Sequence, residues 1–252
     1  MRRETQNVLL VLLGGAVVKI CVNGDFTRYV KPSLQPWLLA AGVFTILIAV
    51  VGIVRDLRSG RDDDTHDTHG AHGAHEGAHD AHGHAHSSRS PWLLLLPALA
   101  IFLVAPPALG ADKVIRSGSV SAPAPDPGGA GFVALPDEDA PVLKLGDAVT
   151  RAVWDDSGSL DGREIRLVGF VVVMGDGTVH LARLTIGCCA ADAAPIKVRL
   201  TGPDVDAYPA DTWLEVRGRM VPDSATEANH FVPTFDVTGL TPVAAPPDPY
   251  EY

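Results

Sequence analysis

The chain has 252 residues, of which 46% are hydrophobic and 20% are charged, and its formal net charge at pH 7 is −10. This negative charge argues against a nucleic-acid-binding protein, and three cysteines are too few to build a disulfide scaffold. Residues 1–110 hold three long apolar runs and a histidine-rich tract, whereas residues 111–252 resemble a soluble chain. We therefore predict a membrane anchor followed by one globular domain.

The apolar runs are Val8–Val22, Pro36–Val54 and Pro91–Ala111. A membrane-spanning helix needs about 20 apolar residues, so we predict two spans within residues 1–60 and a third at 91–111. Lys19 is the one charge inside the first run. Two interpretations of Lys19 stay open: its amine extends to the membrane interface, or it contacts another membrane protein.

Basic residues in short loops predict the orientation of the spans. Arg2 and Arg3 precede the first span, and four arginines lie between the second and third spans. The loop between the first two spans carries only Arg28 and Lys31. We therefore expect a multi-pass protein of the cell membrane, with the N-terminus and the 61–90 loop in the cytoplasm and the C-terminal domain outside.

The predicted cytoplasmic loop, residues 61–90, is rich in histidine, with Asp, Glu, Gly and Ala between the histidines. Imidazole is a good ligand for Zn²⁺ and other divalent transition metals, and the loose spacing predicts weak binding at several sites. A plain polar linker and a pH sensor are the alternatives. The eight candidate ligands are His66, His69, His72, His75, His79, His82, His84 and His86.

After a predicted linker at 112–131, residues 132–252 are expected to form a β-rich domain. Residues 144–156 carry apolar side chains at helical spacing and predict one short helix. Alternating apolar residues then predict five or six strands without helical crossovers, which favours antiparallel pairing. We expect a small barrel of the oligonucleotide/oligosaccharide-binding (OB) type, with Gly169 and Gly218 at tight mid-strand corners. The predicted strands lie within 163–174, 179–189, 195–200, 211–221 and 230–243.

Two adjacent cysteines, Cys188 and Cys189, lie between two of these strands, and Asp192 follows. Zn²⁺ accepts sulfur, nitrogen and oxygen ligands together, so one hypothesis is a metal site that also includes His180 or His230. Adjacent side chains on an extended chain point to opposite faces, so both thiols reach one metal only if the backbone bulges, which Gly187 permits. A redox pair and two buried structural thiols are the alternatives.

Arg183 lies upstream of the cysteines, and we consider an ion pair between Arg183 and Asp192 that pins the loop. The sequence has no Ser-His-Asp set, phosphate-binding glycine loop or HExxH motif. We therefore expect a protein without enzymatic activity.

Several segments resemble one family: RYVKPS after the first span, PWLLAAG in the second, the histidine loop, LDGREIRLVGFV, and LARLTIGCCAADAAPIKVRL. Together they are similar to the YcgQ-like subunits of two-component permeases. The resemblance implies a family motif of Cys188, Cys189 and Asp192, with Arg183 upstream. It also implies a multi-span partner of the YraQ/YcgR-like permease type, but no substrate.

These observations predict an accessory subunit of a membrane permease that handles a transition metal such as zinc. The outer domain would bind the metal through the cysteine motif, and the histidine loop would bind it on the other side. An extracytoplasmic thiol-redox protein and a structural scaffold for the permease are the alternatives.

Overall fold

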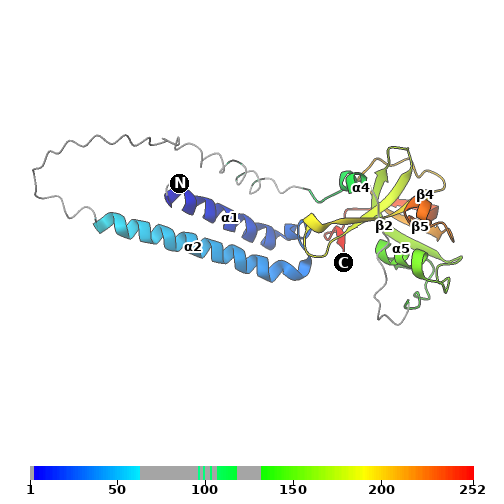
Figure 1. Cartoon of the computed structure of the whole chain (residues 1–252), viewed down its shortest axis with the longest axis horizontal. Coiled ribbons are helices and arrows are strands. Elements are labelled where there is room, and N and C mark those ends of the chain that lie inside the picture. The colour runs from blue at the N-terminus through cyan, green and yellow to red at the C-terminus, as the bar shows by residue number, and fades with distance from the viewer. Residues whose placement is uncertain (1–2, 63–95, 97–98, 100–102, 104–106, 118–131) are drawn as a thin grey trace, which may run out of the picture. The chain divides into compact units, whose positions relative to one another are not determined.

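The computed structural model describes residues 3–62, 96, 99, 103, 107–117 and 132–252 (Figure 1). The chain divides into two compact units. One unit, Met1–Phe26 with Ser33–Pro106, contains the long N-terminal helices. The other unit, Thr27–Pro32 with Pro107–Tyr252, contains the strands. The short segment Thr27–Pro32 lies between the two long helices in sequence, yet it belongs to the strand-rich unit.

The helical unit contains α1 (Arg3–Asn23) and α2 (Gln35–Asp62), which pack side by side (Figure 1). Both are candidate membrane spans, with mean hydropathies of 1.7 over Gln6–Asn23 and 2.6 over Pro32–Arg58. Their outward-facing side chains are large and apolar, as lipid-facing side chains are, with Phe44 64% exposed. The first two predicted spans therefore correspond to helices of suitable length and composition.

The histidine loop lies outside the described residues, and so does most of the predicted third span. Pro107–Gly110 and helix α4 (Ala111–Ser117) follow and belong to the strand-rich unit. Ala111 and Val114 of α4 are buried against the sheet. Part of the segment expected to be linker is thus a packed helix, because a short apolar stripe of two residues falls below what sequence periodicity detects.

The sheet contains seven strands in the order β1-β2-β5-β6-β4-β3-β7, and β2 also pairs with β3. This last pairing closes β2, β5, β6, β4 and β3 into a ring. Adjacent strands of the ring are antiparallel except β4 and β6, which are parallel. The strands are β1 (Val142–Leu143), β2 (Glu164–Val173), β3 (Val179–Thr185), β4 (Ala194–Thr201), β5 (Trp213–Met220), β6 (Thr234–Pro242) and β7 (Tyr250–Glu251).

The strands predicted from alternating apolar residues are confirmed, and so is the predicted helix, which is α5 (Leu145–Trp154). The two mid-strand glycines lie where neighbouring strands approach closely. A Cβ atom on Gly169 would lie 2.7 Å from the Ala182 carbonyl oxygen, and one on Gly218 would lie 2.1 Å from that of Asp236. A side chain at either position would force the strands apart.

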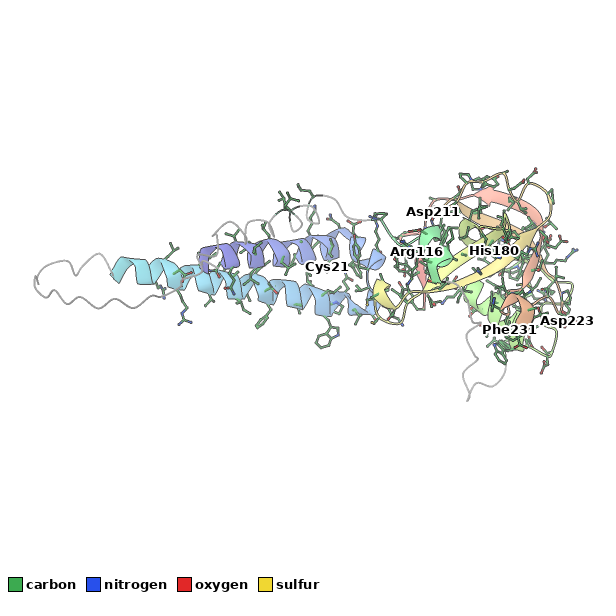
Figure 2. All side chains as sticks on the ribbon, turned by 45° about the horizontal axis from the view of Figure 1, so that its top comes forward. Cys21, Arg116, His180, Asp211, Asp223 and Phe231 are labelled. Atoms are coloured by element: carbon green, nitrogen blue, oxygen red, sulfur yellow. The ribbon has the colours of Figure 1, made fainter. Side chains whose placement is uncertain are left out.

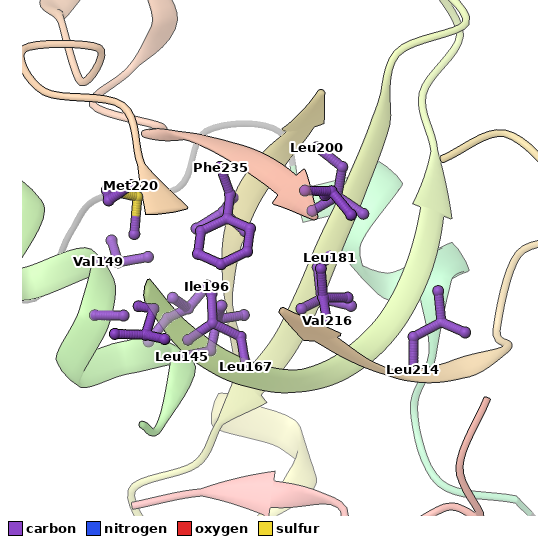
Figure 3. Close-up of a cluster of buried hydrophobic side chains, with 14 of the residues drawn as sticks. Leu145, Val149, Leu167, Leu181, Ile196, Leu200, Leu214, Val216, Met220 and Phe235 are labelled. Atoms are coloured by element: carbon purple, nitrogen blue, oxygen red, sulfur yellow. The ribbon is translucent and has the colours of Figure 1, made fainter. Parts of the chain in front are cut away.

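Two apolar clusters pack on opposite faces of the ring. The inner cluster lies inside the ring and beneath α5, and includes Leu167, Leu181, Val216 and Phe235 (Figure 3). The outer cluster lies beneath α4 and includes Phe170 of β2 and Leu184 of β3. Both side chains point to the face of their strand opposite to that of Leu167 and Leu181. Because successive strand residues point to opposite faces, β2 and β3 contribute apolar side chains to both clusters.

Candidate metal centre

The cysteines lie in the connection from β3 to β4, which runs from Ile186 to Ala193. A single turn of 3₁₀ helix, Ala190–Asp192, interrupts the extended chain within it. Cys189 directly precedes the turn and has extended backbone angles, with φ −152° and ψ 166°. The connection is therefore bent, and the two thiols need not point apart.

The Asp192 carboxylate organises this bend. One of its oxygens accepts the Gly187 N–H at 3.0 Å, and the other accepts the Cys188 N–H at 2.8 Å and the Cys189 N–H at 3.4 Å. Three successive backbone N–H groups thus converge on one side chain, as in other anion-holding turns. Since a carboxylate has about four acceptor positions, the Cys188 thiol, which also hydrogen-bonds to Asp192, occupies the remaining one, and a metal ion would replace that thiol proton.

The sulfur atoms of Cys188 and Cys189 and a carboxylate oxygen of Asp192 all lie within 4.8 Å of one another. All three residues are accessible to solvent, Cys189 less than the others. Both thiols could reach one metal ion only if the backbone bulged, and the bend does bring both thiols to the same side as Asp192. The donor set of two sulfurs and one oxygen suits Zn²⁺, which binds three protein ligands and keeps one position open at non-structural sites.

Gly187 leaves room for the carboxylate. A Cβ atom at this position would lie 3.3 Å from the Asp192 oxygen that accepts the Cys188 and Cys189 N–H groups. Such a contact is shorter than ordinary van der Waals separation, so a side chain would push against the group that shapes the loop. Gly187 thus permits the bend because it has no side chain that would displace the Asp192 carboxylate.

The segment between the two long helices holds the loop from its other edge. Val30 forms an antiparallel bridge with Cys189. The Lys31 N–H donates to the Cys188 carbonyl at 3.1 Å, and the Ala190 N–H donates to the Tyr29 carbonyl at 2.7 Å. The backbone around both cysteines is therefore fixed by residues about 160 positions earlier in the chain, which no local sequence pattern indicates.

The charge of Asp192 controls the neighbouring thiol. A hydrogen bond to Asp192, with a second to Cys189, raises the pKa of Cys188 to about 11. The Cys188 thiol and the backbone N–H groups in turn lower the pKa of Asp192. Without a metal, Cys188 is therefore a thiol at neutral pH, unlike the activated thiolates of redox enzymes. A bound metal ion reverses this preference, because a coordinating thiol loses its proton.

Neither His180 nor His230 belongs to the cysteine cluster. His180 lies at the start of β3 and Cys188 follows the end of that strand, and at about 3.3 Å per residue an extended strand keeps the two far apart. His230 lies beside His180, lining the same cavity near Lys197. Figure 2 labels His180 on its strand. The prediction that His180 or His230 completes the cysteine site is therefore wrong, because both residues line a separate cavity.

The Arg183 side chain is buried and turned away from Asp192. Its Nε lies 3.5 Å from the Glu251 carboxylate, an Nη atom donates to the Tyr250 carbonyl at 3.3 Å, and the guanidinium stacks over Trp213 at 4.9 Å. Glu251 also accepts the N–H groups of Leu145 and Gly146 at the start of α5. The predicted Arg183–Asp192 ion pair is therefore wrong, and Arg183 instead anchors the C-terminal strand β7.

The eight histidines of the 61–90 loop lie outside the described residues, so their predicted metal binding stays a prediction. Cys21 is buried on α1 and is a free thiol (Figure 2).

Two family models match the chain. The DUF1980 N-terminal domain matches residues 5–119, and the DUF1980 C-terminal domain matches residues 148–252. No curated protein and no solved structure shows significant similarity to it. The matched ranges include both long helices, α4, the whole ring of strands and the cysteine cluster. The chain is thus consistent with a protein of the DUF1980 family.

Proposed function

We propose that this protein is a non-enzymatic accessory subunit of a membrane permease that binds a transition metal, most readily Zn²⁺, through Cys188, Cys189 and Asp192. The convergence of two sulfurs and a carboxylate within 4.8 Å carries the proposal. The three ligands, two exposed and one half-buried, leave a metal ion open to exchange, which suits transfer to a partner better than permanent structural binding.

The raised pKa of Cys188 favours this function over thiol-redox chemistry. A redox-active cysteine needs a thiolate near neutral pH, whereas Asp192 stabilises the protonated thiol. The same carboxylate becomes a favourable neighbour once a divalent cation is present, since it then adds negative charge to the ligand set. Asp192 thereby makes the site responsive to a metal ion.

We propose that the strand-rich unit lies outside the cell membrane. Thr27–Pro32, between the two candidate spans, belongs to the same unit as Pro107–Tyr252. If α1 and α2 cross the membrane, both segments lie on one side, so the chain crosses again between Asp62 and Pro107. The apolar run beginning at Pro91 is the candidate for this third crossing, and because Pro107 already belongs to the strand-rich unit, the run offers 16 residues where the sequence predicted a span of 21. The few basic residues of the first loop favour the outer side.

We infer that the ring of five strands is a barrel of the OB type. A ring closed by the β2–β3 pairing, with a single parallel pair between β4 and β6, supports this inference. The fold by itself implies no ligand. The barrel matters for the proposed site because β3 and β4 are paired neighbours in it, so both ends of the connection that carries the cysteines are held by the sheet.

The partner we propose is a multi-span permease of the YraQ/YcgR-like type, as the resemblance to YcgQ-like subunits implies. Three spans are too few to enclose a transport pathway, and the apolar surfaces of α1 and α2 offer area for contact with other membrane helices. The histidine loop would bind metal on the cytoplasmic side.

Cobalt substitution tests the metal site in the purified full-length protein. Co²⁺ bound by two thiolates and a carboxylate should give sulfur-to-metal charge-transfer absorption and the visible bands of tetrahedral cobalt. Cys188→Ser, Cys189→Ser and Asp192→Asn should each weaken or abolish these bands. Cys21→Ser is the matched control and should leave them unchanged.

Absence of charge-transfer absorption in the reduced protein would contradict the metal site. Recovery of a Cys188–Cys189 disulfide, with fast thiol exchange, would instead favour the redox alternative.

A further inference from the structure

The cavity lined by His180 and His230 lies at the other end of β3 from the cysteine loop. Its volume is about 380 Å³, within the range of small-molecule sites. The β2–β3 turn, strands β3 and β4 and the residues around Asn229 form its walls. The polar residues that line it are Asp176, Thr178, His180, Lys197, Arg199, Asn229 and His230.

Two cations from β4 face this cavity. Lys197 pairs in register with Ala182, and Arg199 pairs with His180, so Lys197, Arg199 and His180 project from the same face of the sheet. Lys197 is only 6% exposed. Within the described residues, neither Lys197 nor Arg199 forms an ion pair or a side-chain hydrogen bond. The Lys197 stem is thus packed in the protein while its ammonium group lines the cavity, where the charge of Asp176 acts on it.

His180 adds a second unsatisfied group. It is 7% exposed, and its buried Nδ1 has no hydrogen-bond partner among the described residues. Burial, followed by the charge of Lys197, lowers the pKa of His180 to about 4, so the ring is neutral at pH 7. A neutral ring carries one N–H donor, the Thr178 backbone also interacts with the ring, and the ring lines the cavity.

The opposite wall also presents donors. Asn229 and His230 end a short 3₁₀ turn, and His230 adopts a left-handed backbone conformation with φ 57°. Asp176 is the one carboxylate in the lining, and it already accepts the N–H and hydroxyl of Thr178 at 3.0 and 2.7 Å. The cavity therefore combines two cations that form no ion pair or side-chain hydrogen bond with polar groups from β3 and from the Asn229–His230 segment.

We propose that this cavity binds a small tetrahedral oxyanion of the phosphate class. An oxyanion would pair with the Lys197 ammonium and accept hydrogen bonds from Arg199 at the rim and from the histidines that line the cavity. Donors on several sides suit the oxygens of a tetrahedral anion better than a planar carboxylate, which two donors in one plane satisfy. The positive charges of Lys197 and Arg199 disfavour a metal cation here, so this site is chemically distinct from the cysteine cluster.

Isothermal titration calorimetry of the full-length protein with inorganic phosphate, in a phosphate-free buffer, tests the proposal. We expect saturable binding with a dissociation constant of about 1 mM or tighter. Lys197→Met keeps the apolar stem and removes the charge, and it should weaken binding about tenfold or more. Lys144→Met, at an exposed position before α5, is the matched control and should bind phosphate as the unmodified protein does.

Arg199→Met provides a second variant at a more exposed position in case Lys197→Met does not fold, and it should also weaken phosphate binding. Acetate should bind at least about tenfold more weakly than phosphate. The proposal is overturned if phosphate gives no saturable binding, if every variant that folds binds it as tightly as the Lys144→Met control, or if acetate binds equally well. Zinc binding in this cavity when both cysteines are replaced would also contradict it.

Discussion

Asp192 is the residue that turns two adjacent cysteines into one candidate site. Its carboxylate accepts the N–H groups of Gly187, Cys188 and Cys189 and so bends the chain that would otherwise point the thiols apart. The same carboxylate raises the pKa of Cys188, so this thiol is protonated at neutral pH. Residue types and spacing indicated the three ligands, but only the hydrogen bonds of the bend show that they converge.

Gly187→Ala tests whether the room beside Asp192 matters. The added Cβ atom would lie 3.3 Å from the carboxylate, so the loop must shift by a few tenths of an ångström. We expect zinc affinity, measured by competition with a chromophoric chelator, to fall by about tenfold, because displaced ligands lose near-ideal geometry. Gly175→Ala is the control, since nothing lies within 4 Å of a Cβ atom there. Equal affinity in the two variants would remove Gly187 from the site.

His180 should make stability depend on pH in a defined window. Its pKa is about 4 in the folded chain and about 6.5 when exposed. Between these values the unfolded chain binds a proton that the folded chain does not, so stability falls as the pH drops from 6.5 to 4. The pKa of His180 is lowered by burial of the ring and by the positive charges of Lys197 and Arg199. A hydrogen bond with the Thr178 backbone and the charge of Asp176 act in the opposite direction.

We expect His180 to account for about 1–3 kcal/mol of the loss in the free energy of unfolding on acidification from pH 7 to pH 4.5. His180→Gln should reduce that loss by a similar amount, as measured by denaturant unfolding of the full-length protein at both pH values. His230→Gln, at an exposed position, should retain the full loss. If both variants lose stability equally on acidification, the neutral, buried state of His180 is wrong.

The strands and α5 were predictable because their apolar residues follow the two-residue and 3.6-residue periods over many positions. Helix α4 was not, because only Ala111 and Val114 carry its packing. The pairing of Val30 with Cys189 and of β7 with β3 joins segments remote in sequence. Such contacts depend on the closed ring as a whole, so neither composition nor local pattern reveals them.

Glu251, at the C-terminal end of the chain, joins three elements. It pairs with the buried Arg183 of β3, lies in β7 and accepts the first N–H groups of α5. Glu251→Gln would remove the carboxylate that pairs with the buried Arg183, the largest opposing charge acting on it. We expect it to lower the free energy of unfolding by about 3 kcal/mol, measured by denaturant unfolding. Glu138→Gln, at an exposed position, should change it by less than about 0.5 kcal/mol; similar losses in both would contradict the role of Glu251.

The chain as a whole combines a helical unit with a strand-rich unit, and it enters the strand-rich unit twice. The first entry, Thr27–Pro32, forms one edge of the cysteine loop. In the proposed topology, the connection between two membrane helices thus contacts the metal ligands directly through the backbone. A metal ion bound there would therefore affect the conformation of the segment that joins the two proposed spans.

This topology predicts a labelling pattern in intact cells. A membrane-impermeant maleimide should modify Cys188 and Cys189 after metal is removed with a chelator, because both thiols are accessible on the proposed outer side. A Ser88→Cys substitution in a background without other cysteines should react only after permeabilisation, since the histidine loop is expected in the cytoplasm. Reaction of Ser88→Cys in intact cells would contradict the proposed orientation.

The most direct test of the proposed function is the zinc content of the purified full-length protein, measured by elemental analysis after removal of loosely bound metal. To isolate the cysteine site, residues 62–88 are deleted from every variant. We predict about one zinc ion per chain in this background, and none when Cys188 and Cys189 are both replaced by serine. Equal zinc content with and without the two cysteines, or no zinc in either protein after reconstitution, would contradict a metal centre at Cys188, Cys189 and Asp192.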